Sequence, residues 1–244
     1  MTKEAQAVNT TAPLANVATC MRACERAMNR PEHLPGLVAF YGPSGWGKTT
    51  SAIYAANHYR AYYVEAKSAW TKMALLDALL NEMGLAPEKT VNKRIDQVAE
   101  QLIKSSRPLI LDEFDHVVNR NLVDIVRDIY EGSNAPMLLI GEERIEVNLR
   151  RWERFHNRVL DWVPAQPASL ADAKHLHHLY CKRAKVADDL LAHIHDAAHG
   201  NVRRICVNLE RVQEHALTHN MGRVNLEDWG KRELYTGEAP RRKV

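Results

Sequence analysis

The feature that most constrains this chain is the run Gly42-Pro43-Ser44-Gly45-Trp46-Gly47-Lys48-Thr49-Thr50. It matches the pattern G-x-x-x-x-G-K-[ST] at every fixed position, and this pattern forms a loop that binds phosphate groups. Residues 37–41 before it are apolar and predict a buried strand, whereas residues 50–56 after it predict a helix. Because strand, loop and helix follow in this order, the sequence predicts a nucleotide-binding α/β domain rather than an ordinary glycine-rich turn.

Each fixed residue of this loop has a chemical reason. Glycines allow backbone N–H groups to turn inward around the β- and γ-phosphates, and the helix N-terminus adds its positive dipole end. Lys48 would place a charge on the γ-phosphate, and the hydroxyl of Thr49 would contact Mg²⁺. The loop therefore predicts ATP and Mg²⁺ as cofactors. Trp46 is unusual at a variable position, where it either covers the nucleotide or, as we expect, packs nearby.

A second motif lies at residues 108–113, where four apolar positions lead into two acids. This pattern predicts a central parallel strand that ends near the phosphates. Asp112 would hold the Mg²⁺ shell, and Glu113 would orient and deprotonate the attacking water. An adjacent acid pair indicates an ATP-hydrolysing motor or switch rather than a kinase or a GTPase. The alternative is a strand that happens to end in surface acids.

Composition limits the class of protein. A chain of 244 residues with 45% hydrophobic and 26% charged residues can build one large domain, or a large and a small one. The net charge of +3 means that any nucleic-acid surface would be a local patch. The four cysteines show no metal-ligand spacing, no apolar run approaches a membrane span, and the first residues lack a signal-peptide core. We therefore expect a cytoplasmic protein that does not contact membranes.

Strand and helix patterns alternate along the first two thirds of the chain, which predicts a parallel sheet with helices on both faces. Beyond residue 164 the apolar spacing is helical throughout. The expected strands are 37–41, 61–65, 108–113, 137–140 and 159–163. The expected helices are 14–30, 50–56, 70–83, 91–105, 118–131, 143–152, 169–184, 187–199, 201–219 and 225–233. The expected domains are an N-terminal tail and linker helix (1–36), an ATP-binding α/β domain (37–164), a small helical lid (165–235) and a basic tail (236–244).

Two arginine-containing segments complete a larger pattern. One is Gly200-Asn201-Val202-Arg203-Arg204, at the start of a predicted helix, and the other is the arginine-rich stretch 150–158 before the last strand. With the loop and the acid pair in this order, residues 37–210 resemble the AAA+ ATPase superfamily. That resemblance implies an α/β P-loop NTPase core with a small all-α lid domain.

The resemblance also implies roles for particular residues. Arg203 matches the lid arginine that reaches the γ-phosphate. Arg158, or alternatively Arg154, matches the finger that enters the ATP site of a neighbouring subunit, where it can raise the rate by about 10³–10⁵. Glu142 occupies the place of the first sensor, which is usually Asn, Thr or Gln, so the chain departs from the family pattern there.

Within the superfamily, the Leu-Leu-Ile-Gly-Glu turn at residues 138–142 and Gly-Asn-Val-Arg-Arg at residues 200–204 are similar to one branch. That branch contains the phage Mu B transposition protein and the target-selecting ATPases of bacterial transposons. This similarity implies an ATP-dependent homo-oligomer or filament on double-stranded DNA, a transposase as partner, and contacts mainly with phosphates. Lys67 and Lys72 are candidate DNA contacts, and Lys93 and Arg94, with the neighbouring Lys89, form a second candidate cluster. For each residue the alternative is a solvated helix face.

Other functions remain open from the sequence. A replication initiator or helicase loader would share this build but usually adds a winged-helix domain, for which we expect too little chain. A protein-directed nucleotide switch would bind ATP regardless of DNA. His177 and Cys181 share one helix face and could hold a metal, but they have no evident further ligands.

Overall fold

The structure, a computed structural model, describes residues 11–238, which form two compact units. The larger unit runs from Asn16 to Ala165, and the smaller unit holds residues 166–238 together with residues 11–15. The division therefore falls one residue from the predicted boundary at 164/165. Helix α1 (Ala15–Met28) belongs almost entirely to the larger unit rather than to a separate linker. Most of the predicted basic tail, residues 239–244, lies outside the described residues.

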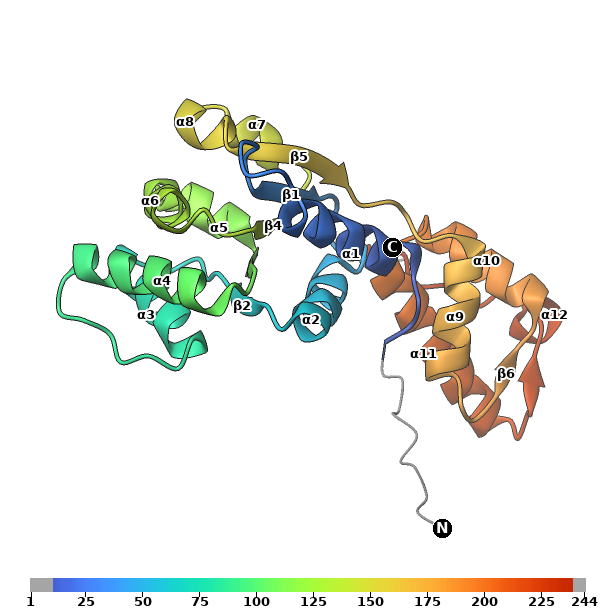
Figure 1. Ribbon diagram of the computed structural model, residues 1–244. Coiled ribbons are helices and arrows are strands. Elements are labelled where there is room, and N and C mark those ends of the chain that lie inside the picture. The colour runs from blue at the N-terminus through green and yellow to red at the C-terminus, as the bar shows by residue number, and fades with distance from the viewer. Residues whose placement is uncertain (1–10, 239–244) are drawn as a thin grey trace, which may run out of the picture. The chain divides into compact units, whose positions relative to one another are not determined.

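The larger unit is built on a parallel sheet of five strands in the order β2-β3-β4-β1-β5. Figure 1 shows this unit with its helices α1 to α8. The three central strands are almost entirely apolar because helices cover both faces of the sheet. The predicted doubly covered parallel sheet is confirmed. The strands are β1 (Leu37–Tyr41), β2 (Tyr62–Glu65), β3 (Leu109–Asp112), β4 (Met137–Gly141) and β5 (Val159–Pro164).

Side chains of successive strand residues alternate between two hydrophobic cores. Leu109 and Leu111 of β3 belong to one core, and Ile110 between them belongs to the other. The first core is completed by helices α3 (Lys72–Glu82), α4 (Val91–Ser105) and α6 (Val123–Ser133), and the second by α1 and α2 (Lys48–Tyr59). Burial on both sides fixes the sheet, and with it the loops at the carboxyl ends of the strands.

The helix predicted at 118–131 is wrong, because the structure has two helices there, α5 (Phe114–Asn119) and α6. The chain turns at Asn121, whose φ of 55° is left-handed, a conformation that asparagine tolerates better than most residues. The Leu122 N–H closes the turn on the Val117 carbonyl at 2.9 Å. Helix α5 therefore begins directly after the acid pair, with Glu113 as its N-cap.

The helix predicted at 143–152 is also shorter than expected. Two short helices, α7 (Ile145–Leu149) and α8 (Glu153–His156), lie between β4 and β5. The ring of Phe155 stacks on Phe114 with centroids 5.7 Å apart. This contact joins the arginine-rich segment to the start of α5.

The smaller unit is mostly helical, around buried side chains such as Leu190, Ile194 and Leu209. It also contains a short parallel pair, β6 (Lys185–Val186) and β7 (Arg223–Val224), which was not expected from the sequence. Because β6 begins at residue 185, the helix expected to reach residue 184 ends at Tyr180. The helices are α9 (Leu170–Tyr180), α10 (Asp188–Ala198), α11 (Val202–Thr218) and α12 (Leu226–Trp229).

Candidate functional site

The glycine-rich loop connects the end of β1 to the start of α2 in the larger unit. Gly45 and Gly47 have φ angles of 81° and 79°, which are left-handed and favour glycine. Gly47 is the N-cap of α2. The backbone N–H groups of the loop therefore precede a helix N-terminus, the arrangement that suits a bound phosphate. The Trp46 side chain packs against the second core rather than standing free.

Lys48 is the first residue of α2, and its ammonium points back over the loop. Its Nζ donates hydrogen bonds to the carbonyls of Gly42 at 2.7 Å and Pro43 at 2.9 Å. Burial lowers the pKa of Lys48, while the nearby carboxylates, Glu113 foremost and Asp112 next, act in the opposite direction. The loop thus places a cation beside the acid pair, ready to contact a phosphate oxygen.

The acid pair lies at the carboxyl end of β3. Asp112 is 2% exposed, and its two oxygens accept hydrogen bonds from different donors. Oδ1 accepts the Glu113 N–H at 2.8 Å, and Oδ2 accepts the Tyr63 hydroxyl at 2.8 Å. Tyr63 lies on β2, beside β3, and its contact with Asp112 was not predicted from the sequence. Only a map of strand neighbours could have shown it, because it is 49 residues from Asp112.

Glu113 has a left-handed backbone, with φ of 52° and ψ of 41°, and it is the N-cap of α5. This conformation is rare for a residue with a side chain and occurs often at functional sites. Burial and the adjacent Asp112 raise the pKa of Glu113, although His116 and Lys48 oppose the shift. A half-buried carboxylate with a raised pKa is suited to accept a proton.

The sheet order explains how the two motifs meet. Strand β4 lies between β1, which leads into the loop, and β3, which leads into the acid pair. The end of β4 at Gly141 pairs with Tyr41, next to the loop. Glu142 follows, with an exposed side chain and a backbone N–H that donates to Asp115 Oδ2 at 2.6 Å. Asp115 had no assigned role from the sequence, and the structure shows that it connects these two strand ends.

The two candidate finger arginines differ in their surroundings. The guanidinium of Arg158 forms an ion pair with Glu131 at 3.2 Å. Arg154, on α8, is exposed, and no side chain in residues 11–238 pairs with it. Arg154 therefore presents a cation that is available to an external anion. Arg203 is an exposed residue in the first turn of α11, in the smaller unit.

The candidate DNA contacts also differ in their exposure and in their partners. Lys67 and Lys72, before and at the start of α3, are exposed, and so is Lys93 on α4. Arg94 is instead held by an ion pair with Asp77 and a hydrogen bond to the Glu88 carbonyl, and its side chain is only 12% exposed. Arg94 is therefore part of the α3–α4 packing and not of the exposed basic surface.

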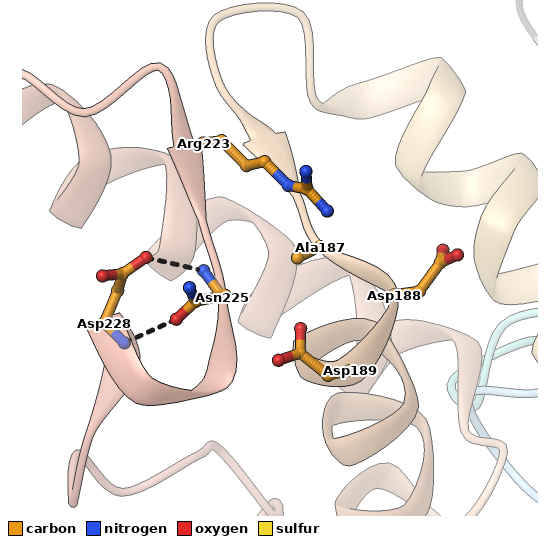
Figure 2. Close-up of a pocket in the computed structure, with 6 residues that line it drawn as sticks. All are labelled: Ala187, Asp188, Asp189, Arg223, Asn225 and Asp228. Atoms are coloured by element: carbon orange, nitrogen blue, oxygen red, sulfur yellow. Dashed lines mark hydrogen bonds between the residues drawn. The ribbon is translucent and has the colours of Figure 1, made fainter.

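Figure 2 shows a polar hollow in the smaller unit. Asn225 and Asp228 form the capping box of α12, and Asp189 accepts the Leu226 N–H at 3.3 Å. These groups stabilise helix starts, so we assign the hollow no ligand. Its lining residues are Ala187, Asp188, Asp189, Arg223, Asn225 and Asp228.

The histidine-rich smaller unit offers no metal centre among the residues that the structure describes. His177 Nε2 accepts the Val186 N–H at 3.1 Å, and Cys181 Sγ lies 3.9 Å from the Leu209 carbonyl. For Mg²⁺ in the larger unit, the hydroxyl of Thr49 and the carboxylate of Asp112 are suitable hard oxygen donors. Mg²⁺ in such sites takes one or two protein ligands and completes its shell with phosphate oxygens and water. Within residues 11–238, none of the helices is both long and apolar enough to cross a lipid bilayer.

Comparisons with known proteins agree with this geometry. Residues 32–149, a little under half of the chain, match a family model described as AAA domain. No curated protein matches the sequence. The fold is similar to that of the Aeropyrum pernix ORC1 protein in complex with DNA, with a TM-score of 0.65 and 17% identity over 90% of this chain and 65% of that one.

Two further solved structures have the same fold. The Aeropyrum pernix ORC2 protein in ADPNP-ADP complexes gives a TM-score of 0.64 with 17% identity, over 86% of this chain and 64% of that one. The Thermotoga maritima RuvB Holliday junction branch migration motor gives 0.59 with 19% identity, over 87% and 66%. The chain thus spans about two thirds of these proteins. The fold is that of an AAA+ P-loop core, in keeping with the AAA domain model that matches residues 32–149. The resemblance to the Mu B branch stays a prediction.

Proposed function

We propose that this chain is an ATPase whose larger unit binds ATP at residues 42–50 and activates water with Glu113. One observation carries the proposal: the loop and the acid pair end the parallel strands β1 and β3, with only β4 between them. Parallel strands end at the same edge of the sheet, so Lys48 and both acids share one site, in agreement with the electrostatic influence of these acids on Lys48.

Each residue has a distinct role in this reaction. Loop N–H groups and Lys48 hold the phosphates, and Lys48 exchanges its carbonyl partners for phosphate oxygens. Thr49 and Asp112 would hold Mg²⁺, which neutralises charge on the β- and γ-oxygens when it is bound. Glu113 accepts a proton from the attacking water, and its raised pKa improves it as a base. Arg203 is the proposed lid contact to the γ-phosphate.

We also propose that the ATP site is completed by an arginine from a second copy of the chain. Arg154 is the better candidate, because Arg158 already pairs with Glu131. This preference reverses the order expected from the sequence. Glu142 follows β4 next to the loop, but its negative charge makes it a poor sensor of phosphate, so we assign its side chain no contact with the nucleotide.

The proposed ligand of the assembled protein is double-stranded DNA, contacted through the exposed lysines Lys67, Lys72 and Lys93. One of the similar structures is a complex with DNA, and another is described as a Holliday junction branch migration motor. The narrower proposal is capture of target DNA for a transposase, supported by the Gly-Asn-Val-Arg-Arg segment at Gly200. A second candidate is an initiator or helicase loader, and the fold similarity to the ORC1 protein in complex with DNA supports it.

The testing experiment is fluorescence anisotropy of a labelled random-sequence duplex, titrated with protein in ADP, in a slowly hydrolysed ATP analogue and without nucleotide. We expect salt-sensitive binding only with the analogue, and loss of binding in Lys48→Ala. Glu113→Gln should bind DNA in ATP itself, because its hydrolysis falls by about 10²–10⁴-fold. Nucleotide binding without any DNA binding would instead support a protein-directed switch.

A matched pair of variants tests the DNA surface. Lys67→Gln combined with Lys72→Gln should weaken duplex binding and reduce its salt dependence, because each removes a phosphate contact. Lys104→Gln is the control, since Lys104 is an exposed lysine that pairs with Glu100 at 3.4 Å. If Lys104→Gln weakened duplex binding as much as the double variant, the proposed DNA surface would be contradicted.

A further inference from the structure

Tyr63 reaches the acid pair from the neighbouring strand. In the register of β2 and β3, Tyr63 pairs with Ile110 and Glu65 with Asp112. Neighbouring residues in a parallel ladder face the same side of the sheet, so the Tyr63 side chain lies on the side that carries Ile110 and Asp112. Its ring packs against the second core, and its hydroxyl donates to Asp112 Oδ2 at 2.8 Å.

The backbone of Tyr63 is also fixed. Strand β2 is at the edge of the sheet, and the Tyr63 N–H donates to Glu82 Oε1 of α3 at 3.2 Å. The ring is therefore anchored by backbone and core contacts, and its hydroxyl is held in place relative to β3.

The two hydrogen bonds to Asp112 fix the orientation of its carboxylate. Oδ1 is held by the Glu113 N–H and Oδ2 by Tyr63. An ionised carboxylate has about four acceptor positions, so two remain for water or a metal ion. In the second of these bonds the phenol of Tyr63 is the donor, so its hydroxyl is committed to Oδ2.

We propose that Tyr63 is a positioning residue for Mg²⁺, acting through the carboxylate of Asp112. The inference rests on the proposed function and deepens it by adding a residue that contacts neither nucleotide nor metal. Groups that orient a metal-binding side chain commonly change metal affinity by about 10–100-fold when removed. Loss of the Tyr63 hydroxyl would leave Asp112 with one anchored oxygen and a freer rotamer.

The experiment is a Mg²⁺ titration of fluorescent ATP-analogue binding, which does not depend on turnover. We expect Tyr63→Phe to raise the Mg²⁺ concentration at half-saturation by about 10-fold, with little change in nucleotide binding in EDTA. Tyr62→Phe is the matched control: Tyr62 is the preceding residue, belongs to the first core and accepts a hydrogen bond from Gln101 Nε2 at 2.9 Å. Urea unfolding of both variants checks that they fold.

A double variant tests whether Tyr63 acts on Mg²⁺ binding through Asp112. If Tyr63 acts through Asp112, adding Tyr63→Phe to Asp112→Asn should give no further Mg²⁺ shift. An unchanged Mg²⁺ midpoint in Tyr63→Phe, or an equal shift in Tyr62→Phe, would overturn the positioning role while leaving the proposed ATPase intact. Absence of Mg²⁺-dependent nucleotide binding by the wild-type protein would overturn both.

Discussion

The backbone N–H of Glu142 donates a 2.6 Å hydrogen bond to Oδ2 of Asp115. The ladder between β3 and β4 ends at the Leu111–Leu139 pair, so this bond joins the two segments beyond the last paired residues. Asp115 is 8% exposed and lies two residues after Glu113. The position of the turn that carries Glu113 is therefore coupled to the end of β4.

Asp115→Ala should lower the free energy of unfolding by about 1–3 kcal/mol, because it leaves the Glu142 N–H without its acceptor. Asp115→Asn should cost less, since an amide oxygen still accepts the bond, although more weakly than a carboxylate. Urea denaturation measures both. The control is Asp124→Ala, which removes an exposed ion pair with Arg127 and should change stability by less than about 1 kcal/mol. Equal losses at both sites would contradict a special role for Asp115.

Gly141→Ala should destabilise the larger unit through a steric clash. A Cβ at Gly141 would lie 2.1 Å from Ile145 Cδ1 and 2.9 Å from Asp115 Oδ2. Overpacking of this kind costs about 1–3 kcal/mol, which thermal unfolding would detect. Gly222→Ala is the comparison, because no atom lies within 4 Å of a Cβ at that position. A Gly141→Ala protein as stable as the wild type would show that this end of β4 can relax.

Arg154→Ala should lower ATP hydrolysis by about 10³-fold or more if Arg154 enters a neighbouring site, whereas Arg158→Ala should have the smaller effect. In each assembled site, the finger Arg154 would come from one subunit and the base Glu113 from its neighbour. Mixing Arg154→Ala protein with Glu113→Gln protein should therefore produce some sites that contain both groups and hydrolyse ATP. Steady-state phosphate release by the mixture measures this. Two inactive proteins that stay inactive when mixed would argue against a finger at Arg154.

His177 should make the smaller unit sensitive to acid. Burial, and secondarily His178, lower the pKa of His177 below its ordinary value of 6.5, while Asp188 opposes this. The unfolded chain therefore binds this proton more readily, so stability is retained above about pH 6.5 and falls as pH decreases through the lowered pKa. Protonation would also remove the acceptor of the Val186 N–H.

The measurement is the urea midpoint of wild-type and His177→Gln proteins between pH 7.5 and 5. The wild type should lose more stability on acidification than the variant, which cannot titrate at this position. His175→Gln, at an exposed histidine of the same helix, should follow the wild type. Parallel curves for wild type and His177→Gln would contradict the assignment.

Several features could be predicted from the sequence because they depend on neighbours in the chain. The glycine-rich loop, the apolar strand before Asp112 and the helical spacing of α4 are local patterns, and the structure has the elements where they were expected. The break at Asn121 was missed because the apolar spacing continues across it, and a left-handed asparagine leaves no distinct signal in that spacing.

Roles that depend on long-range contacts could not be predicted in this way. Lys93 and Arg94 are adjacent and look alike in the sequence, yet only Arg94 is held by Asp77, because α3 and α4 pack together. The short β6–β7 pair was missed for the same reason, since two residues give no periodicity and their pairing is a tertiary contact.

The sequence by itself determined the phosphate-binding loop, the acid pair and the doubly covered parallel sheet, because fixed spacing and apolar periodicity specify them locally. Only the tertiary structure decided that β4 lies between the strands that carry the two motifs, and that Tyr63 contacts Asp112 while Asp115 contacts Glu142. It also decided that Arg158 is ion-paired, whereas Arg154 has no ion-pair partner within residues 11–238. These outcomes depend on strand order and side-chain packing between segments far apart in the chain, where burial selects one arrangement from many that the local sequence permits.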